Sequence, residues 1–350
     1  MQVYIKAAFI SSLGLGTMTT FAGSHWMFAW AGLEINMLAV LPLMTVKFHP
    51  RASEAATKYF LVQATASAAI LFAALVNSFM FGAWDLFNMI HPLPGSIMIL
   101  ALTLKIGIAP LHMWLPEVLQ GLNLDAAFIL ATWQKLAPFI MLVQLPSPHP
   151  DLLLALGLLS IMAGGWGGMN QTQTRKIMAY SSMAHMGWIM AIYNFSPTLA
   201  LLTLALYLIM TSAAFLTLKV LNAFSVKGLA RAMFNLPMLT ALTPMTLLSL
   251  GGLPPLSGFA PKWLITNEIV VNKLPLMATI MTLVTLFSLY FYLRLTNSLS
   301  LTMSPNSNVG LLPLFLSKSP IAPMLPLVIS GSMMLIPLIP VITAAMPACK

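Results

Sequence analysis

Residues 95–115 read GSIMILALTLKIGIAPLHMWL, an apolar run with one cation, Lys105, near its centre and a proline, Pro110, five residues later. A charge inside the hydrocarbon of a bilayer is costly, so by default such a residue lines a polar pathway and does not face lipid. Because proline removes a helical donor and clashes with the preceding turn, the run is expected to break near Gly107–Pro110. The segment predicts a membrane helix interrupted beside a buried lysine.

A second segment repeats this arrangement. Residues 250–263 read LGGLPPLSGFAPKW and again place a lysine, Lys262, beside a Gly/Pro interruption in an apolar run. Matched broken helices in two halves of a membrane protein indicate an internal repeat with an ion site at each break.

The composition assigns the chain to the membrane class. Of its 350 residues, 59% are hydrophobic and 7% charged, against roughly 25% charged in an average soluble domain. The single cysteine, Cys349, excludes a disulfide framework and leaves no thiolate set for an iron–sulfur cluster or structural zinc. The net charge of +9 falls in short loops and is not gathered on one basic face, so we expect no nucleic-acid partner.

The fold class predicted is an all-α polytopic membrane protein with about 11 transmembrane helices at roughly 20 residues per crossing. These form two inverted five-helix repeats, each with a broken helix, plus a C-terminal helix. The repeats occupy residues 1–146 and 147–300, and residues 301–350 hold a loop and the last helix. The first span is expected to be retained and not cleaved as a signal peptide. The expected spans are 3–22, 25–46, 57–80, 95–115, 123–145, 151–169, 177–195, 198–220, 238–269 (broken), 275–296 and 322–345.

Loop charges orient this layout. One side receives eleven Lys and Arg residues, and the opposite side receives only Lys273 and Lys350. Because positive loops stay in the compartment of insertion, the N-terminus is expected on the positive side and the C-terminus on the other. The eleven residues are Lys6, Lys47, Arg51, Lys58, Arg175, Lys176, Lys219, Lys227, Arg231, Arg294 and Lys318.

Four ionisable residues remain at membrane depth: Glu34, Lys105, Lys135 and Lys262. Burial opposes the charged state of a lysine and a nearby carboxylate restores it, so a lysine whose partner moves can load and release a proton. We expect Glu34 and Lys105 to form a salt bridge or to be linked by one water, since either charge left alone in hydrocarbon is costly. The structural alternative is a set of static ion pairs that fix helix register.

The histidines divide into two groups. His112 follows Lys105 by seven residues and could relay protons toward the loop, and His185 could do likewise; in both cases the alternative is a hydrogen-bonded packing histidine. The other four fall in loops or at span ends, and no pair has metal-ligand spacing on one helix face, so no metal is expected. The four loop histidines are His25, His49, His91 and His149.

Two glycine-rich stretches, 13–16 and 164–168, are expected to let helices approach closely.

Several motifs together resemble the antiporter-like proton-pumping membrane subunits of respiratory complex I. Residues 104–117, LKIGIAPLHMWLPE, and residues 250–263 carry the family pattern. The shorter stretches WAGLEIN (30–36), EAATKYF (54–60) and WQKLAP (133–138) narrow the match. The resemblance covers essentially the whole chain.

The resemblance implies a proton pathway. Glu34 would pair with Lys105 and tune its proton affinity, and Lys135 would connect that site along a hydrated axis to Lys262 on the exit side. It implies residence in the mitochondrial inner membrane, with the N-terminus in the matrix and the C-terminus in the intermembrane space. Neighbouring antiporter-like chains and other membrane subunits of complex I would be the partners, together with the lipid bilayer. NADH, FMN, iron–sulfur clusters and ubiquinone would belong to other subunits, with no cofactor in this chain.

Two alternatives remain open. One is a secondary cation/proton antiporter subunit outside any respiratory complex, and the other is a non-pumping structural membrane scaffold. Asp125 stands where the family pattern has an uncharged residue, which leaves the entry path near Lys135 open; it could cap the fifth helix.

Overall fold

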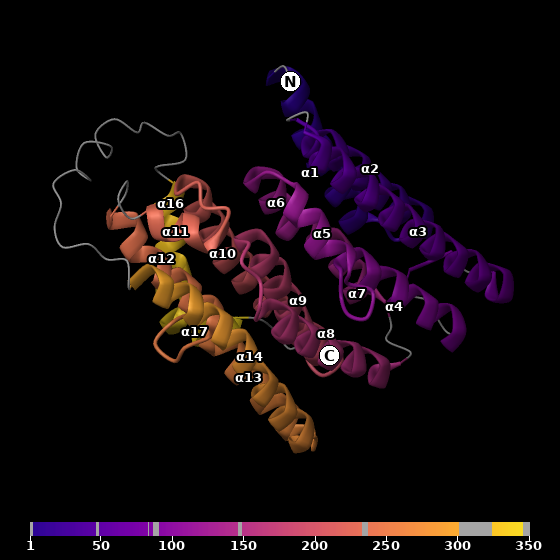
Figure 1. Cartoon of the computed structure of the whole chain (residues 1–350). Coiled ribbons are helices and arrows are strands. Elements are labelled where there is room, and N and C mark those ends of the chain that lie inside the picture. Colours follow the sequence, from indigo (N-terminus) through magenta and orange to yellow (C-terminus); the bar gives the residue numbers. More distant parts are fainter. Residues whose placement is uncertain are drawn as a thin grey trace. The chain divides into compact units, whose positions relative to one another are not determined.

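The computed structural model describes residues 3–46, 49–82, 84–86, 91–145, 149–232, 237–300 and 324–345. Every regular element in these ranges is a helix (Figure 1). The chain divides into two compact units, Met1–Leu159 and Ser160–Lys350, and each is described by itself. The predicted repeat boundaries at 146 and 300 remain a prediction, because a boundary of compactness need not coincide with a boundary between repeats. Four residues used in the sequence arguments, Lys47, Lys318, Cys349 and Lys350, lie outside the described residues.

The first unit is built from long apolar helices and shorter pieces. Each predicted span over this stretch corresponds to helix, although the third helix begins earlier than expected, at Pro50. The elements are α1 (Val3–Ala22), α2 (Trp26–Met44), α3 (Pro50–Phe81), α4 (Pro92–Ile106), α5 (Trp114–Gly121), α6 (Leu124–Ala131), the 3-10 turn η1 (Trp133–Lys135), α7 (Leu136–Gln144) and the start of α8 (Pro150–Gly168).

Three of the histidines expected at span ends are helix N-caps. His25, His49 and His91 precede α2, α3 and α4, and the Nδ1 atom of each accepts a hydrogen bond from the backbone N–H two residues later, at 3.2–3.3 Å. These bonds satisfy one of the donors left free at each helix start. The prediction that these histidines mark span ends is confirmed.

Glycines set the contact between α1 and α2. A Cβ on Gly32 would meet Thr20 at 2.6 Å and the Gly16 carbonyl at 2.8 Å, whereas a Cβ on Gly14 would meet nothing within 4 Å. The close approach predicted for residues 13–16 is therefore confirmed at Gly16 and not at Gly14. Small residues let membrane helices pack with their backbones close together.

The N-terminal part of α3 contacts α5. Lys58 donates to Glu117 on α5 at 2.9 Å and pairs with Glu54 on its own helix at 2.8 Å. A Cβ on Gly121 would meet the Arg51 carbonyl at 2.6 Å, so the backbones of α3 and α5 lie close together here. These contacts fix the position of the second half of the broken helix.

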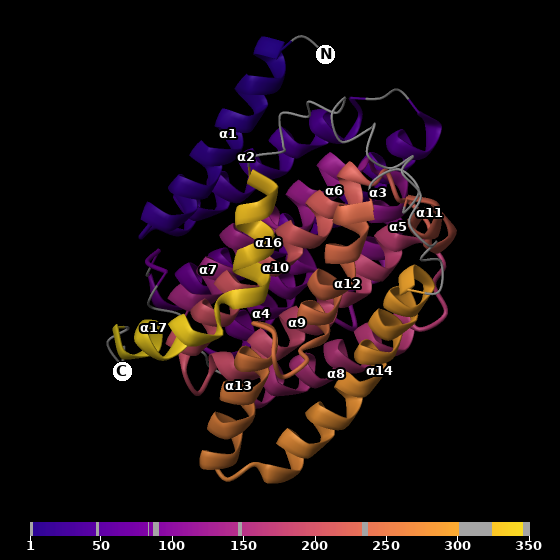
Figure 2. The same ribbon diagram turned by 90° about the vertical axis from the view of Figure 1, so that its left-hand side faces the viewer.

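The second unit continues with α8 and adds shorter helices that the sequence did not predict. Figure 2 shows α13 and α14 side by side as an antiparallel pair joined by a short turn. The elements are α9 (Thr174–Tyr193), α10 (Pro197–Val220), α11 (Val226–Ala232), α12 (Pro237–Gly251), α13 (Phe259–Val271), α14 (Pro275–Ser300), α16 (Met324–Met334), the 3-10 turn η3 (Ile336–Leu338) and α17 (Ile339–Ala345).

The glycine run 164–168 packs α8 against two neighbours. A Cβ on Gly164 would meet the Tyr180 carbonyl on α9 at 2.7 Å, and a Cβ on Gly168 would meet the Phe291 ring on α14 at 2.8 Å. The predicted close approach is confirmed for this stretch.

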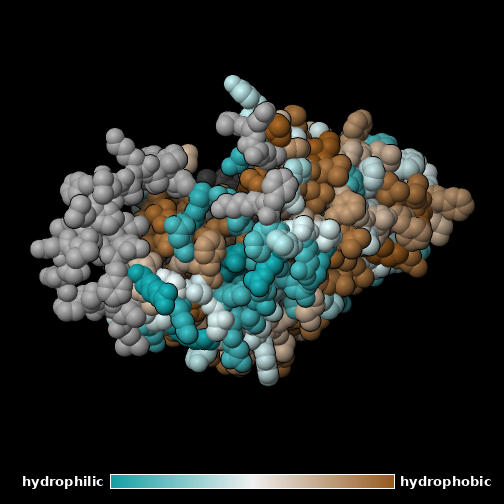
Figure 3. Space-filling model, turned by 45° about the horizontal axis from the view of Figure 1, so that its top comes forward, coloured by the Kyte–Doolittle hydropathy of each residue, from teal (hydrophilic) through white to brown (hydrophobic). Residues whose placement is uncertain are grey.

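The structure supports a polytopic membrane protein. Among the described residues, six helices are long and apolar enough to cross a membrane, and shorter apolar helices include α4 and α16. Large apolar side chains such as Phe79 and Trp166 stay 91% and 71% exposed, and Figure 3 shows apolar residues over much of the face in view. The count of eleven crossings remains a prediction. The single C-terminal helix predicted over 322–345 is wrong, because η3, with Pro337, interrupts it between α16 and α17.

Candidate functional site

The first predicted helix break lies where the sequence placed it. The helix α4 ends at Ile106, Gly107 takes a left-handed conformation with φ +84°, and α5 begins at Trp114. The interval contains Pro110, which cannot donate to a helical carbonyl. Lys105 occupies the last turn of α4 and is buried, with 6% of its surface exposed. The prediction of non-helical backbone beside Lys105 is confirmed.

Lys135 also lies at a helix interruption, which the sequence analysis did not predict. The span expected at 123–145 consists of α6, the 3-10 turn Trp133–Lys135 and α7. Pro138 supplies a reason, because it has no N–H for the carbonyl four residues before it. Lys135 is 3% exposed. Asp125 lies exposed in the first turn of α6, where Asn123 and not Asp125 is the N-cap residue.

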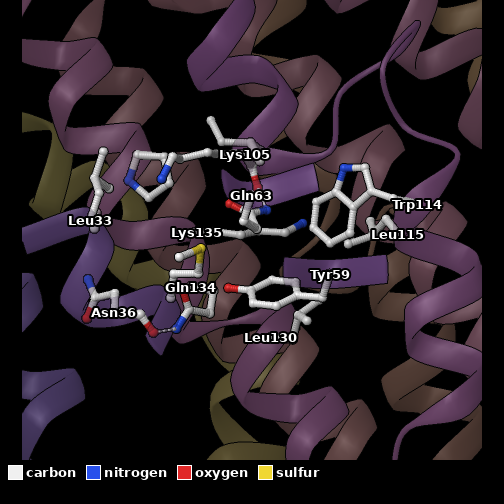
Figure 4. Close-up of a pocket in the computed structure, with 14 residues that line it drawn as sticks. Leu33, Asn36, Tyr59, Gln63, Lys105, Trp114, Leu115, Leu130, Gln134 and Lys135 are labelled. Carbon is white, nitrogen blue, oxygen red and sulfur yellow. Dashed lines mark hydrogen bonds between the residues drawn. The ribbon is translucent and has the colours of Figure 1, made fainter. Parts of the chain in front are cut away.

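One pocket in the first unit brings Lys105 and Lys135 together (Figure 4). The volume open to the centre of a water molecule is about 20 Å³, room for roughly one water. Six helices, α2 to α7, and the η1 turn contribute to its wall, so residues far apart in the sequence meet here. The lining residues are Leu33, Asn36, Met37, Tyr59, Gln63, Lys105, Ile106, Trp114, Leu115, Leu130, Gln134, Lys135, Ala137 and Pro138.

Neutral side chains support the two lysines. The amide of Gln63 on α3 donates to the Lys105 carbonyl at 3.2 Å, and the Trp114 indole donates to the Leu104 carbonyl at 3.1 Å. Both carbonyls belong to the end of α4, where the helical donors are missing. Gln134, beside Lys135, donates from its amide to the Asn36 carbonyl on α2 at 3.2 Å. The pocket is thus held by hydrogen bonds on both sides of the lysine pair.

Glu34 lies beside this pocket and not in its wall. It is half-buried on α2, next to the lining residue Leu33. Its carboxylate lies within electrostatic range of Lys105 and of the Tyr59 phenol. No nitrogen–oxygen contact of 4.0 Å or less joins Glu34 to Lys105 within the described part of the chain. The expected link through one water remains a prediction.

The two histidines considered as relays have ordinary structural surroundings. His112 lies in the break between α4 and α5, where its Nδ1 lies 3.2 Å from the Pro110 carbonyl. His185 on α9 packs its ring against Tyr207 with 5.6 Å between ring centroids. Neither lines the pocket, and their relay roles remain predictions.

The second predicted break contains Lys262. The helix α12 ends at Gly251, Gly252 has φ +82°, and α13 begins at Phe259. Lys262 lies in the first turn of α13 and donates from Nζ to the Gly251 carbonyl at 2.6 Å. Non-helical backbone beside Lys262 is confirmed, except that Pro261, predicted within the break, already belongs to α13.

Sequence reasoning missed the polar residues that surround the lysine pair. Tyr59, Gln63 and Asn36 are at most 5% exposed and come from helices whose other residues are largely apolar. A buried polar group needs a hydrogen-bond partner, so an isolated amide in an apolar span is a signal that could have found Gln63. In the ranges that the structure describes, no cluster of three His, Cys, Asp or Glu residues could hold a metal ion.

The chain matches known families over nearly its whole length. Residues 23–288 match the model described as "NADH:quinone oxidoreductase/Mrp antiporter, TM", and residues 289–343 match "NADH dehydrogenase subunit 2 C-terminus". The chain is 54% identical to NADH-ubiquinone oxidoreductase chain 2 of Formosania lacustris and 53% identical to that of Salmo salar. Each alignment covers 98% of this chain and 99% of the relative.

A solved structure agrees with this assignment. A chain in respiratory complex I from Thermus thermophilus with bound Aureothin superposes with a TM-score of 0.81 at 25% identity, over 96% of this chain and 80% of that one. Three findings agree. One family model matches most of the sequence, the curated relatives align over nearly the whole chain, and a solved structure shares the fold. This chain belongs to the NADH:quinone oxidoreductase/Mrp antiporter transmembrane family.

Proposed function

We propose that this chain is a proton-translocating membrane subunit of respiratory complex I, in the role of NADH-ubiquinone oxidoreductase chain 2. The full-length relatives carry that name. The observation that supports the chemistry is the pocket that holds Lys105 and Lys135 together, each at a helix interruption. Intramembrane lysines that face a polar cavity mark proton and ion pathways.

The two lysines act as coupled proton carriers. Two ammonium groups that share a buried pocket oppose each other, so a proton on one disfavours a proton on the other. A protonated Lys105 passes one proton to a water molecule in the pocket, and that water passes one to the neutral amine of Lys135. A carboxylate close to an ammonium favours its charged state, and this is the role proposed for Glu34 beside the wall of the pocket. A change in the distance from Glu34 to Lys105 then moves the proton forward.

The later steps of the pathway remain predictions. They are the transfer from Lys135 to Lys262 and the exit of the proton through Lys262, together with the roles of His112 and of Glu34. NADH, FMN, iron–sulfur clusters and ubiquinone are assigned to other subunits, so the redox energy reaches this chain as a conformational or electrostatic signal. We also propose that the chain lies in the mitochondrial inner membrane, with its N-terminus in the matrix. Its partners there are neighbouring antiporter-like chains and the surrounding lipid.

The test replaces each pocket lysine with methionine, singly and together, in the assembled complex. Lys105→Met and Lys135→Met keep length and apolar bulk, and each should lower NADH-driven turnover or the number of protons moved per electron. Because the lysines share one pocket, the double variant should fall short of the sum of the two effects. Lys6→Met removes the same charge at an exposed site and serves as the control.

The alternatives predict other outcomes. A scaffold tolerates loss of a buried charge, so unchanged turnover and proton ratio in all three variants, with assembly verified, would favour it. A secondary antiporter exchanges cations for protons in vesicles without NADH and does not co-purify with an NADH-oxidising assembly.

A further inference from the structure

The ammonium of Lys262 lies at the carbonyl end of α12. From the first turn of α13, the side chain reaches back across the break, and its Nζ donates to the Gly251 carbonyl at 2.6 Å. Within the described residues no carboxylate approaches Nζ to 4.0 Å or less. The acceptor for this cation is therefore the end of a half-helix and not an acidic side chain.

The end of α12 suits a cation. The last carbonyls of a helix lack helical donors and carry a partial negative charge. The Gly252 N–H bonds the carbonyls of Leu248 and Ser249, each at 3.1 Å, which leaves the Gly251 carbonyl to Lys262. The arrangement depends on the left-handed conformation of Gly252, which residues with a Cβ rarely adopt.

Gly252 also leaves the space that the ammonium occupies. A Cβ at this position would lie 2.8 Å from the Lys262 Nζ and 3.0–3.1 Å from its Cδ and Cε atoms. Because the lysine is flexible at its tip, a larger residue would displace the ammonium more readily than it would displace the backbone.

The first break uses different donors. Gly107 has nearly the same φ, +84°, but the carbonyls of Leu104 and Lys105 are bonded by Trp114 and Gln63, which carry no charge. Within the described residues these two side chains, and not the Lys105 ammonium, bond the carbonyls at the end of α4, whereas Lys262 caps the end of α12. The two breaks are alike in backbone conformation and different in the role of the lysine.

We propose that the carbonyl end of α12 is the binding site of the Lys262 ammonium, and that Gly252 is the positioning residue that keeps this site open. This inference rests on the proposed proton translocation and deepens it. When Lys262 passes one proton to water and becomes an amine, its charge-assisted bond to Gly251 weakens to an ordinary one. Proton occupancy of Lys262 is thereby coupled to the geometry of the second break.

In any pH experiment, the effect of Lys262 must be distinguished from the effects of other titratable or charged groups near this break. Tyr292 is the nearest of them to Gly251, because its ring would lie 3.6 Å from a Cβ there. The groups on the elements packed against α12 and α13, and on α13 itself, are Glu268, Tyr207, Lys219, Tyr290, Tyr292, Arg294, Arg175, Lys176, Tyr180, His185 and Tyr193, and α16 contributes none.

The experiment compares substitutions at two glycines that share the left-handed backbone conformation, in the assembled complex. Gly252→Ala should lower coupled turnover or the proton ratio by roughly tenfold, the loss of about one charge-assisted hydrogen bond. Gly82→Ala imposes a similar backbone strain, at φ +68°, where a Cβ meets nothing within 4 Å, and should leave both readouts unchanged.

A second pair of variants gives a readout that strain alone does not move. Asp and Asn tolerate the left-handed conformation better than other residues. Gly252→Asp places a carboxylate beside the ammonium, and this negative charge stabilises the protonated form of Lys262. The pH at which turnover falls on the alkaline side of its profile should therefore increase by about one unit or more. Gly252→Asn has the same shape without the charge and should not shift that limb.

The outcomes separate this inference from the proposed function. If Gly252→Ala behaves like Gly82→Ala, and the Asp and Asn variants share one pH profile while Lys262→Met loses coupling, the binding site is wrong and proton translocation stands. If Lys262→Met pumps normally, the role of Lys262 in the proposed function fails first. A structure of the native complex with Lys262 Nζ beyond hydrogen-bond distance of the Gly251 oxygen would overturn the inference, whichever variants assemble.

Discussion

The side-chain amide of Gln63 on α3 donates a hydrogen bond of 3.2 Å to the backbone carbonyl of Lys105, the residue whose side chain lines the lysine pocket. The bond joins a continuous helix to the broken end of α4. It satisfies a carbonyl that lost its helical donor at the break, and it holds the backbone of Lys105 at a fixed distance from α3.

Gln63→Leu should therefore disturb Lys105 without touching its amine. The buried carbonyl left without a donor costs about 1–3 kcal/mol, so the first unit should be less stable and NADH-driven turnover should fall. Gln144→Leu is the control, because Gln144 also donates to a backbone carbonyl, that of Phe21 at 3.3 Å, and neither residue lines the lysine pocket. This bond is exposed, so its loss should cost less stability than the loss of the buried Gln63 bond. Thermal stability and turnover of the assembled complex are the measurements. Equal losses of turnover in both variants would show that Gln63 has no special role at Lys105.

Tyr59→Phe should change the pocket and not the fold. Tyr59 is 2% exposed and lines the pocket with Lys105 and Lys135, so the variant removes one hydroxyl from its wall and keeps the ring. We expect fewer protons per electron or slower turnover, with unchanged assembly, since the proposed proton-carrying water would lose a hydrogen-bonding neighbour. Tyr290→Phe makes the same change at a residue that is 56% exposed and should have no effect. A full proton ratio in Tyr59→Phe would remove the hydroxyl from the pathway.

Lys262→Met should separate pumping from scaffolding. The variant keeps the apolar stem and removes the titratable amine, so the complex should assemble while its coupled turnover or its proton ratio falls. Lys227→Met removes a charge from an exposed position on α11 and should leave both quantities unchanged. Proton uptake and quinone reduction in reconstituted vesicles decide the question. In a scaffold without a pumping role, loss of the half-buried Lys262 charge should instead be neutral or stabilising.

Gly32→Ala should weaken the packing of α1 on α2. The added Cβ would contact the Thr19 hydroxyl, Thr20 and the Gly16 carbonyl, and the backbone at Gly16 cannot move aside cheaply. Overpacking of this kind costs about 1–3 kcal/mol. Gly14→Ala, on the partner helix α1, meets nothing within 4 Å and is the control. The yield of assembled complex and its melting temperature should fall in the first variant alone; equal values would contradict this account of the contact.

The sequence by itself determined the features that depend on local chemistry. Long apolar runs predicted the helices, since a backbone in lipid must satisfy its own hydrogen bonds. Gly107 with Pro110, and Gly251 with the prolines after it, predicted the two breaks, because glycine permits a left-handed turn and proline cannot donate. The buried lysines were visible as charges in apolar runs. Asp125 and the last span, by contrast, were placed less well, since caps and short helices depend on a few residues each.

Only the tertiary structure decided which of these residues meet. Nothing in the sequence spacing puts Lys105 and Lys135 on one pocket, because that depends on how α4 and η1 pack against α2 and α3. The Gln63 bond to Lys105 spans 42 residues, and the bond of Lys262 to Gly251 depends on the turn that redirects α13. A carbonyl freed at a helix end accepts whichever donor packing brings to it, and helical periodicity carries no information about that donor.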